Sequence, residues 1–432
     1  VYYNYFTRYW FKLDKVAGKS VQNVLSKAYA TSSYQDVLKG LASGTVKYKS
    51  NNRKYDAYGV MNETNINTSH NIVDGLNVDS DLKLGVKVHF DKINRDQYTV
   101  SYTQAVGGAL SGSTGSVFDA TKEQISKGYA LYFEERAKIN KFTFTAGSRF
   151  EYVNTFYRSG RTSYDKEKVY AFVPGGGVVY DHNENISVFG GIYRGISMPG
   201  PSSAYDSGTP LNPEKSTAKE LGLRYADDEI SSQTVLYHTN FDNVIVIDNS
   251  NAGDSTDNGG KVISKGIEFS NAYQPASLLP ATWGDIGFYA NYTFTNATLD
   301  GDAATTDTES LFAGGRDGNN VPYVPEHQWS FGTDYQYNKF NFGINMTYRS
   351  ETYGTAEQTE TEQSIGVANA RAGRIDDAWL LNFSGGYEVN DNFDISAGIK
   401  NATDLEYIST RHPTGVRSGT PLTAWLKATA SF

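Results

Sequence analysis

The sequence contains no cysteine, only 11 prolines among 432 residues, and six scattered histidines. Without cysteine there is no disulfide framework, and a zinc site of thiolate ligands is excluded. No stretch approaches the roughly 18 consecutive apolar residues that a membrane helix needs. The formal net charge of −9 argues against a nucleic-acid partner. No nucleophile elbow, HExxH sequence or phosphate-binding glycine loop occurs, so we expect no enzyme activity, no metal site and no cofactor.

Aromatic residues are abundant instead: 32 Tyr, 22 Phe and 5 Trp accompany 42 Gly. A tyrosine ring suits a boundary between apolar and wet surroundings. The mean hydropathy of −0.50 is typical of a soluble protein. An outer-membrane barrel gives the same average, because only alternate residues of its strands face lipid.

Alternation with period two is the dominant pattern. In the segment 141–153, Phe142, Phe144 and Phe150 fall on one face, while Thr143 and Arg149 fall on the other. The segments 340–349, 393–400 and 423–432 alternate in the same way. The strands run to about ten residues or more, which suits a tilted membrane strand better than a sandwich strand of about 5–6 residues.

The connections alternate between short and long, as they do in transmembrane barrels with short periplasmic turns and long outer loops. The short turns are 140–141, 182–185, 338–339 and 390–392, and we expect long loops near 14–54, 93–127, 197–215, 249–260, 300–325, 354–376 and 406–420. Helix-like spacing at Val21, Val24, Leu25 and Ala28, and at Val37, Leu38 and Leu41, predicts short helices that pack on the rim.

The predicted fold is all-β: a transmembrane antiparallel barrel portion of about 16 strands that fills residues 1–432 as one domain. The strands are expected at 1–13, 55–67, 79–92, 128–139, 141–157, 168–181, 186–196, 216–227, 230–248, 261–274, 285–299, 326–338, 340–353, 377–389, 393–405 and 421–432.

Six segments in the second half resemble the TonB-dependent receptors of the bacterial outer membrane. They are Tyr193–Pro199, Leu211–Ser216 with Lys219–Tyr225, Gly260 with Ser264–Phe269, Val321–Pro325 with His327, Lys400–Tyr407, and the terminal Phe432. Within the family, the segments Phe6–Leu13, Asn51–Gly59 and Leu84–His89, with Asp91 and Arg95, are most similar to the ferric dicitrate type.

This resemblance implies an outer-membrane transporter that takes up a ferric chelate, either citrate-like or a siderophore. It implies a barrel of about 22 strands around an N-terminal plug. The chain would then lack the signal peptide, the TonB box, the plug and about six strands. The implied partners are the chelate, the TonB–ExbB–ExbD energy-coupling complex, reached through the missing N-terminal part, and outer-membrane lipid and lipopolysaccharide.

An anionic ferric chelate calls for arginine forks and aromatic rings. The candidate ligand residues in or near the expected loops are Arg53, Arg95, Arg158, Arg161, Arg316, Arg374, Arg411, Tyr98 and Tyr205; Arg371, Arg417, Tyr55, Tyr102 and Tyr164 lie in the same regions. Each arginine could instead pair with a neighbouring carboxylate or a lipopolysaccharide phosphate. Two other functions stay open: a passive porin of about 16 strands, and a structural or adhesive barrel.

Overall fold

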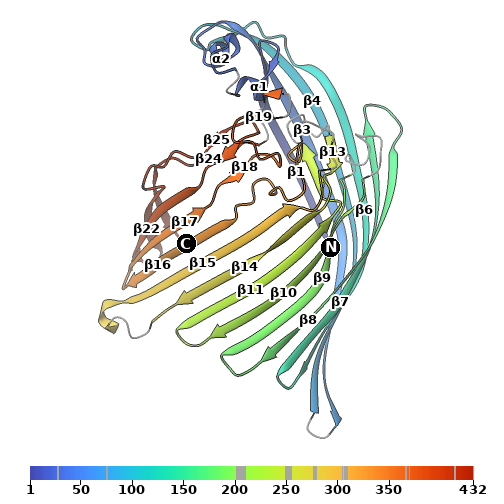
Figure 1. Ribbon diagram of the computed structural model, residues 1–432, viewed down its shortest axis with the longest axis vertical. Helices are drawn as coiled ribbons and strands as arrows, with labels where there is room; N and C mark the ends of the chain where they lie inside the picture. The colour runs from blue at the N-terminus through green and yellow to red at the C-terminus, as the bar shows by residue number, and fades with distance from the viewer. Residues whose placement is uncertain are drawn as a thin grey trace.

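One curved antiparallel sheet forms nearly all of the protein in the computed structural model (Figure 1). The structure describes residues 1–26, 29–73, 76–200, 211–248, 255–275, 280–303, 305, 310–364, 367–368, 370–412 and 415–431. Among the described residues, no helix has the length and apolar character needed to cross a membrane.

The sheet has 18 strands, two of which, β2 (Lys19–Ser20) and β5 (Leu110–Ser111), have only two residues each. The others follow chain order: β1 (Tyr2–Val16), β3 (Gly44–Val73), β4 (Leu76–Gln104), β6 (Val117–Ile139), β7 (Phe142–Ser159), β8 (Asp165–Asp181), β9 (Ile186–Ser197), β10 (Glu214–Ala226), β11 (Ile230–Asp242), β14 (Val262–Tyr273), β15 (Asp285–Leu299), β16 (His327–Tyr337), β17 (Phe340–Arg349), β22 (Ala378–Asn390), β23 (Phe393–Lys400) and β26 (Thr423–Ala430). Each pairs antiparallel with the next, which confirms the predicted all-β fold. Within the described residues no pairing joins β1 to β26, so closure of the barrel stays a prediction.

The short turns lie where the alternation predicts them. β6 and β7 meet at Asn140–Lys141, and β16 and β17 meet at Asn338–Lys339. Asn140 and Asn338 have φ of 53° and 51°, a left-handed conformation that asparagine tolerates better than most side chains.

Two of the expected loops are wrong in extent. β3 has 30 residues, β4 has 29 and β6 has 23, so strand structure occupies much of 14–54 and 93–127. These strand parts carry many polar residues on both faces, and the sequence pattern therefore resembles a loop. Backbone pairing nevertheless continues through them, as between Arg53 and Arg95.

Small helices and ribbons lie mostly at the long-loop end. The helices there are α1 (Val21–Val24) and α2 (Ser33–Leu38), whereas η2 (Ala281–Trp283), a short 3-10 turn, lies between β14 and β15 at the short-turn end. Four two-stranded ribbons join β12 (Ile245–Asp248) to β13 (Ser255–Asn258), β18 (Thr352–Tyr353) to β21 (Arg374–Ile375), β19 (Gln363–Ser364) to β20 (Val367–Ala368), and β24 (Ile408–Thr410) to β25 (Arg417–Ser418).

The predicted rim helices are confirmed as short helices on β1. Val24 and Val37 pack with Val16 and Val46 in a small apolar cluster in which each is at most 4% exposed. The Ser32 hydroxyl caps α2 by accepting from the Gln35 backbone N–H. Ala28 lies outside the described residues.

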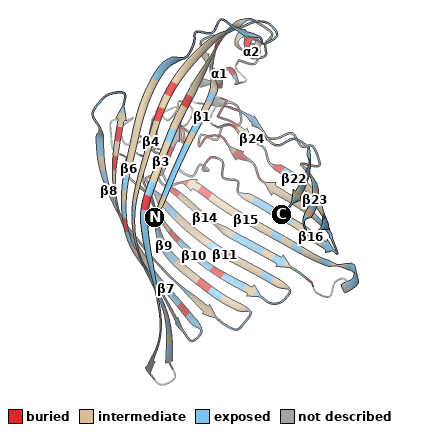
Figure 2. Ribbon diagram, turned by 180° about the vertical axis from the view of Figure 1, so that it is seen from behind, coloured by how far each residue is buried: buried red, intermediate tan, exposed pale blue. Residues whose placement is uncertain are grey.

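The two faces of the sheet differ in chemistry. Leu131, Phe150 and Phe172 are opposite one another across β6, β7 and β8, and they are 61%, 46% and 61% exposed. So large an apolar surface needs lipid to cover it. Lys87, His89, Asp91 and Glu151 lie on the other face, where they line a hollow of about 190 Å³. Figure 2 shows how little of the sheet is buried on either face. We call the apolar face outer and the polar face inner.

Candidate ligand-binding site

Four cations stand in one row across the inner face near its long-loop end. The strand register places Arg8 opposite Arg53, Arg53 opposite Arg95, and Arg95 opposite Lys122. Residues directly opposite in antiparallel strands project to the same side of a sheet, so β1, β3, β4 and β6 each contribute one positive charge. We call Arg8, Arg53, Arg95 and Lys122 the inner cation row.

Aromatic rings flank the inner cation row. Phe6 and Tyr55, one row nearer the short turns, have ring centroids 5.6 Å apart. The Arg8 guanidinium carbon lies 5.9 Å from the Trp10 ring, and the Lys122 ammonium lies 5.8 Å from the Tyr157 ring. These contacts hold the long cationic stems against flat apolar surfaces.

Side-chain amides complete the wall on the other side of the row. Asn51 and Gln97 are opposite each other and are 1% and 4% exposed. The Arg53 Nε donates to Asn51 Oδ1 at 3.0 Å, which fixes the orientation of that guanidinium. Arg95 is itself 8% exposed. A semi-buried set of guanidinium and amide donors between aromatic rings can bind a compact anion that carries carboxylate groups.

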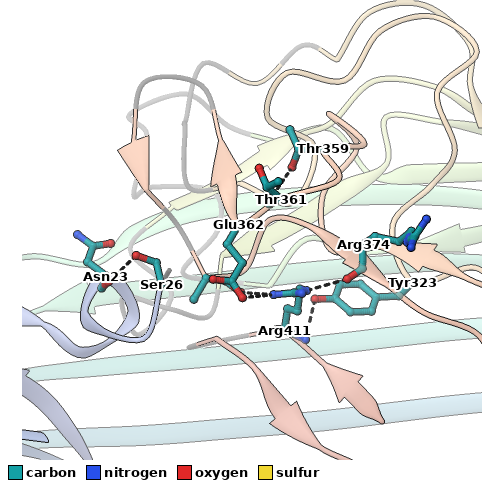
Figure 3. A network of polar contacts seen from close by, with 9 residues as sticks. Asn23, Ser26, Tyr323, Thr359, Thr361, Glu362, Arg374 and Arg411 are labelled. Carbon is teal, nitrogen blue, oxygen red and sulfur yellow. Dashed lines mark hydrogen bonds and ion pairs between the residues drawn. The ribbon is translucent and has the colours of Figure 1, made fainter. Parts of the chain in front are cut away.

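The predicted residue Arg411 lies elsewhere, in a network that ties together the connections before β16, between β17 and β22, and between β23 and β26 (Figure 3). Its Nη1 donates to Glu362 Oε1 at 3.1 Å and to the Ala370 carbonyl at 3.4 Å, and its Nε donates to the Arg374 carbonyl at 3.1 Å. The two charged side chains are only 8% and 12% exposed. We call this the loop network.

Tyr323 belongs to the loop network, because its hydroxyl accepts from the Arg411 backbone N–H at 3.3 Å. Burial raises the pKa of Tyr323, so this hydroxyl stays protonated over the physiological range. The loop network is therefore a structural tie between connections that are far apart in sequence.

The remaining candidates fall into separate places. Arg374 pairs with Asp376 at 2.9 Å and with Glu360 and Glu351 at 3.4 and 3.6 Å. Arg158 and Tyr98 lie on the outer face, where Arg158 pairs with Glu123 at 2.8 Å and Tyr98 contacts Phe118. Arg161, Arg316 and Arg417 are exposed, whereas Arg371 is buried. The Tyr102 ring packs on Tyr48, and the Tyr164 hydroxyl donates to the Glu123 carboxylate. Tyr205 lies outside the described residues.

Of the residues predicted from the sequence, only Arg53 and Arg95 belong to the inner cation row. Arg8 and Lys122 are not among the candidates, because Arg8 falls in the strand expected at 1–13 and Lys122 falls in an expected loop. The available signal is the alternation itself, since Phe6, Arg8 and Trp10 share a face. In the described part of the chain, no group of three or more His, Cys, Asp or Glu could hold a metal ion.

Comparisons with known proteins agree on the family. The profile "TonB dependent receptor-like, beta-barrel" matches residues 2–402. The catecholate siderophore receptor Fiu of Escherichia coli K12 is 24% identical over 273 residues, which cover 59% of this chain and 32% of that receptor. The chain therefore spans about a third of the length of the curated relative that it matches.

Solved structures share the fold. The unliganded ferric citrate transporter FecA superposes with a TM-score of 0.62 at 20% identity, over 90% of this chain and 61% of that one. The copper transporter OprC gives a TM-score of 0.58 at 12% identity, over 90% and 65%. Proteins of this family are transport receptors of the bacterial outer membrane. Since the profile covers nearly the whole chain, the protein belongs to the TonB-dependent receptor β-barrel family.

Proposed function

We propose that the protein takes up an anionic ferric chelate across the outer membrane, and that the inner cation row is part of the chelate-binding wall. The observation that supports this is the register that lines up Arg8, Arg53, Arg95 and Lys122 on the inner face. The similar proteins FecA and Fiu are named for ferric citrate and for catecholate siderophores, which are also ferric chelates.

The row places like charges directly opposite one another on neighbouring strands. Like charges directly opposite one another in a sheet destabilise it. A bound polyanion reverses this repulsion, because each guanidinium then gains a charge-assisted hydrogen bond. We propose a chelate with carboxylate arms, of the citrate type, since planar guanidinium forks match carboxylates in pairs.

Transport in this proposal is active, and the protein is not an enzyme. The outer loops and the inner wall capture the chelate, and the TonB–ExbB–ExbD complex supplies energy through the N-terminal part of the whole receptor. Membership of the receptor family favours this over a passive porin. A steady open conductance of the full receptor in planar bilayers would instead support the porin.

The test is chelate binding by the full-length receptor purified from outer membranes. Ferric dicitrate is titrated against wild type and the Arg53→Gln/Arg95→Gln variant, with Lys138→Gln/Lys339→Gln as a matched control. The control removes the same charge from exposed positions at the short-turn end. We expect the first variant to bind at least about a hundredfold more weakly, since it loses two charge-assisted bonds of roughly 1.5–3 kcal/mol each. Equal affinity in all three proteins would refute the binding wall.

A further inference from the structure

A second cationic surface lies on the outer face of β3, β4, β6, β7 and β8, directly beyond the apolar band. The band ends at a row of rings, in which Tyr129, Tyr152 and Tyr170 are opposite one another. Their centroids are 5.9 and 4.9 Å apart, and the rings are stacked. Such a row marks the boundary between hydrocarbon and headgroups.

The next rows toward the long loops are basic. Lys127 and Lys168 both lie opposite Asn154, Lys166 lies opposite Phe156, and Lys92 lies opposite Ile125. Lys54 and Arg158 follow one row further on. We call Lys54, Lys92, Lys127, Arg158, Lys166 and Lys168 the outer cation cluster. Because short turns are periplasmic in such barrels, the cluster faces the outer leaflet.

Carboxylates offset only part of this charge. Glu123 lies 3.4 Å from the Lys92 ammonium and 2.8 Å from the Arg158 guanidinium, and Asp56 is opposite Lys92. Asp96, the third carboxylate on this stretch of the face, accepts from the Thr121 hydroxyl at 2.7 Å. Between the aromatic row and Asp96, the described outer face of these strands therefore carries six cations and three carboxylates.

Phe156 holds two of the lysines in place. The Lys127 ammonium lies 5.5 Å from the centre of the ring, and the Lys166 ammonium, from the strand on the other side, lies 5.9 Å from it. The two ammonium groups therefore lie close to the same ring. Their N–H donors can reach one ligand on the long-loop side of the aromatic row. A headgroup phosphate at that depth would accept from both.

We propose that the outer cation cluster binds a phosphorylated glycolipid of the outer leaflet. The phosphates contact the lysines, and the acyl chains lie along the apolar band that Leu131, Phe150 and Phe172 form. A free phosphate ion would use the same donors, but it would leave the adjoining band uncovered. The site is on the face opposite the inner cation row and does not depend on the identity of the chelate.

The experiment titrates lipid A in detergent micelles against the full-length, lipid-depleted receptor, with inorganic phosphate in parallel. The variant is Lys127→Gln/Lys166→Gln/Lys168→Gln. The matched control is Lys138→Gln/Lys141→Gln/Lys339→Gln, which removes three exposed lysines at the short-turn end. At about fivefold per lysine near a charged membrane surface, we expect the variant to bind lipid A roughly a hundredfold more weakly and the control to bind as wild type does.

Three results would overturn the proposal: equal lipid A affinity in the variant, an equal loss in the control, or inorganic phosphate binding as tight as lipid A. Ferric dicitrate binding, measured on the same samples, separates this site from the inner cation row. We expect it to be unchanged in the lysine variant, which also verifies that the variant is folded.

Discussion

The inner cation row and the loop network use the same residue type in opposite ways. In the row, Arg53 lies opposite both Arg8 and Arg95, so neighbouring charges repel. In the network, Arg411 donates to a carboxylate and two carbonyls and is 8% exposed. The comparison teaches that the role of an arginine at the long-loop end can be inferred only from its neighbours. An arginine that donates to a carboxylate and to carbonyls stabilises the structure. Arginines that lie opposite one another on neighbouring strands point to the binding of an anion.

The largest expected effect is on the network. Arg411→Ala leaves the Glu362 carboxylate nearly buried without its cation, and breaking such a pair costs roughly 3–5 kcal/mol. We expect hydrogen exchange in 370–376 and 406–412 to accelerate by more than a hundredfold, while exchange in β3 and β4 stays at the wild-type rate. Equal protection in Arg411→Ala would mean that the loops are held by other contacts.

The next effect is on the row. Arg53→Gln removes one opposed charge, so we expect chelate affinity to fall about tenfold. The thermal midpoint of unfolding should stay unchanged or rise slightly, since repulsion is relieved. A loss of stability comparable to that of Arg411→Ala would erase the distinction between the two regions. Calorimetry and chelate titration on one preparation measure both quantities.

Salt sharpens the same comparison. The Debye length shrinks from about 10 Å at 0.1 M to about 3 Å at 1 M. Arg8 is exposed and Arg53 and Lys122 are partly exposed, so binding of an anion by the inner cation row should weaken severalfold over that range. The nearly buried Arg411–Glu362 pair is screened much less. Hydrogen exchange in the network should therefore vary little with salt, and a parallel response of both regions would contradict the assignment.

The smallest effect concerns pH and the short-turn end. Hydrogen bonds from the Tyr225 hydroxyl and from the backbone N–H groups of Ile230 and Glu229 lower the pKa of Asp227. A lowered folded pKa stabilises the turn above the unfolded value, near 3.9, and this stabilisation is lost as the pH falls through the folded pKa. The Glu229 and Ile230 amides should be protected at neutral pH and less so in strong acid, while Asp227→Asn should show no such acid response. The arginines of the inner cation row and of the loop network stay protonated over this pH range, so their charges should not alter either region.

Much of the fold follows from the sequence because alternation over the apolar band is unambiguous. Phe142 and Phe144 against Thr143 locate β7 and its outer face, and Asn140 and Asn338 locate turns. The alternation is uninformative where water covers both faces, which is why the extensions of β3, β4 and β6 are missed. The site is harder, because Arg8, Arg53, Arg95 and Lys122 meet only through register, and register depends on pairing across the whole sheet.

Because the strands differ in length, the long-loop end of the sheet is higher on one side than on the other. At about 3.3 Å per residue, the 30 residues of β3 span about 100 Å, several times the thickness of the hydrocarbon core, whereas β23 and β26 have eight residues each. Figure 1 shows β3 and β4 rising to the helices while β16 and β22 stay low. The rim is therefore built of strand over β3 and β4, whereas over β16 and β22 it is built of the small ribbons and the loop network. A bulky visitor, whether nutrient, antibody or phage, meets paired strands on the first side and loops on the second.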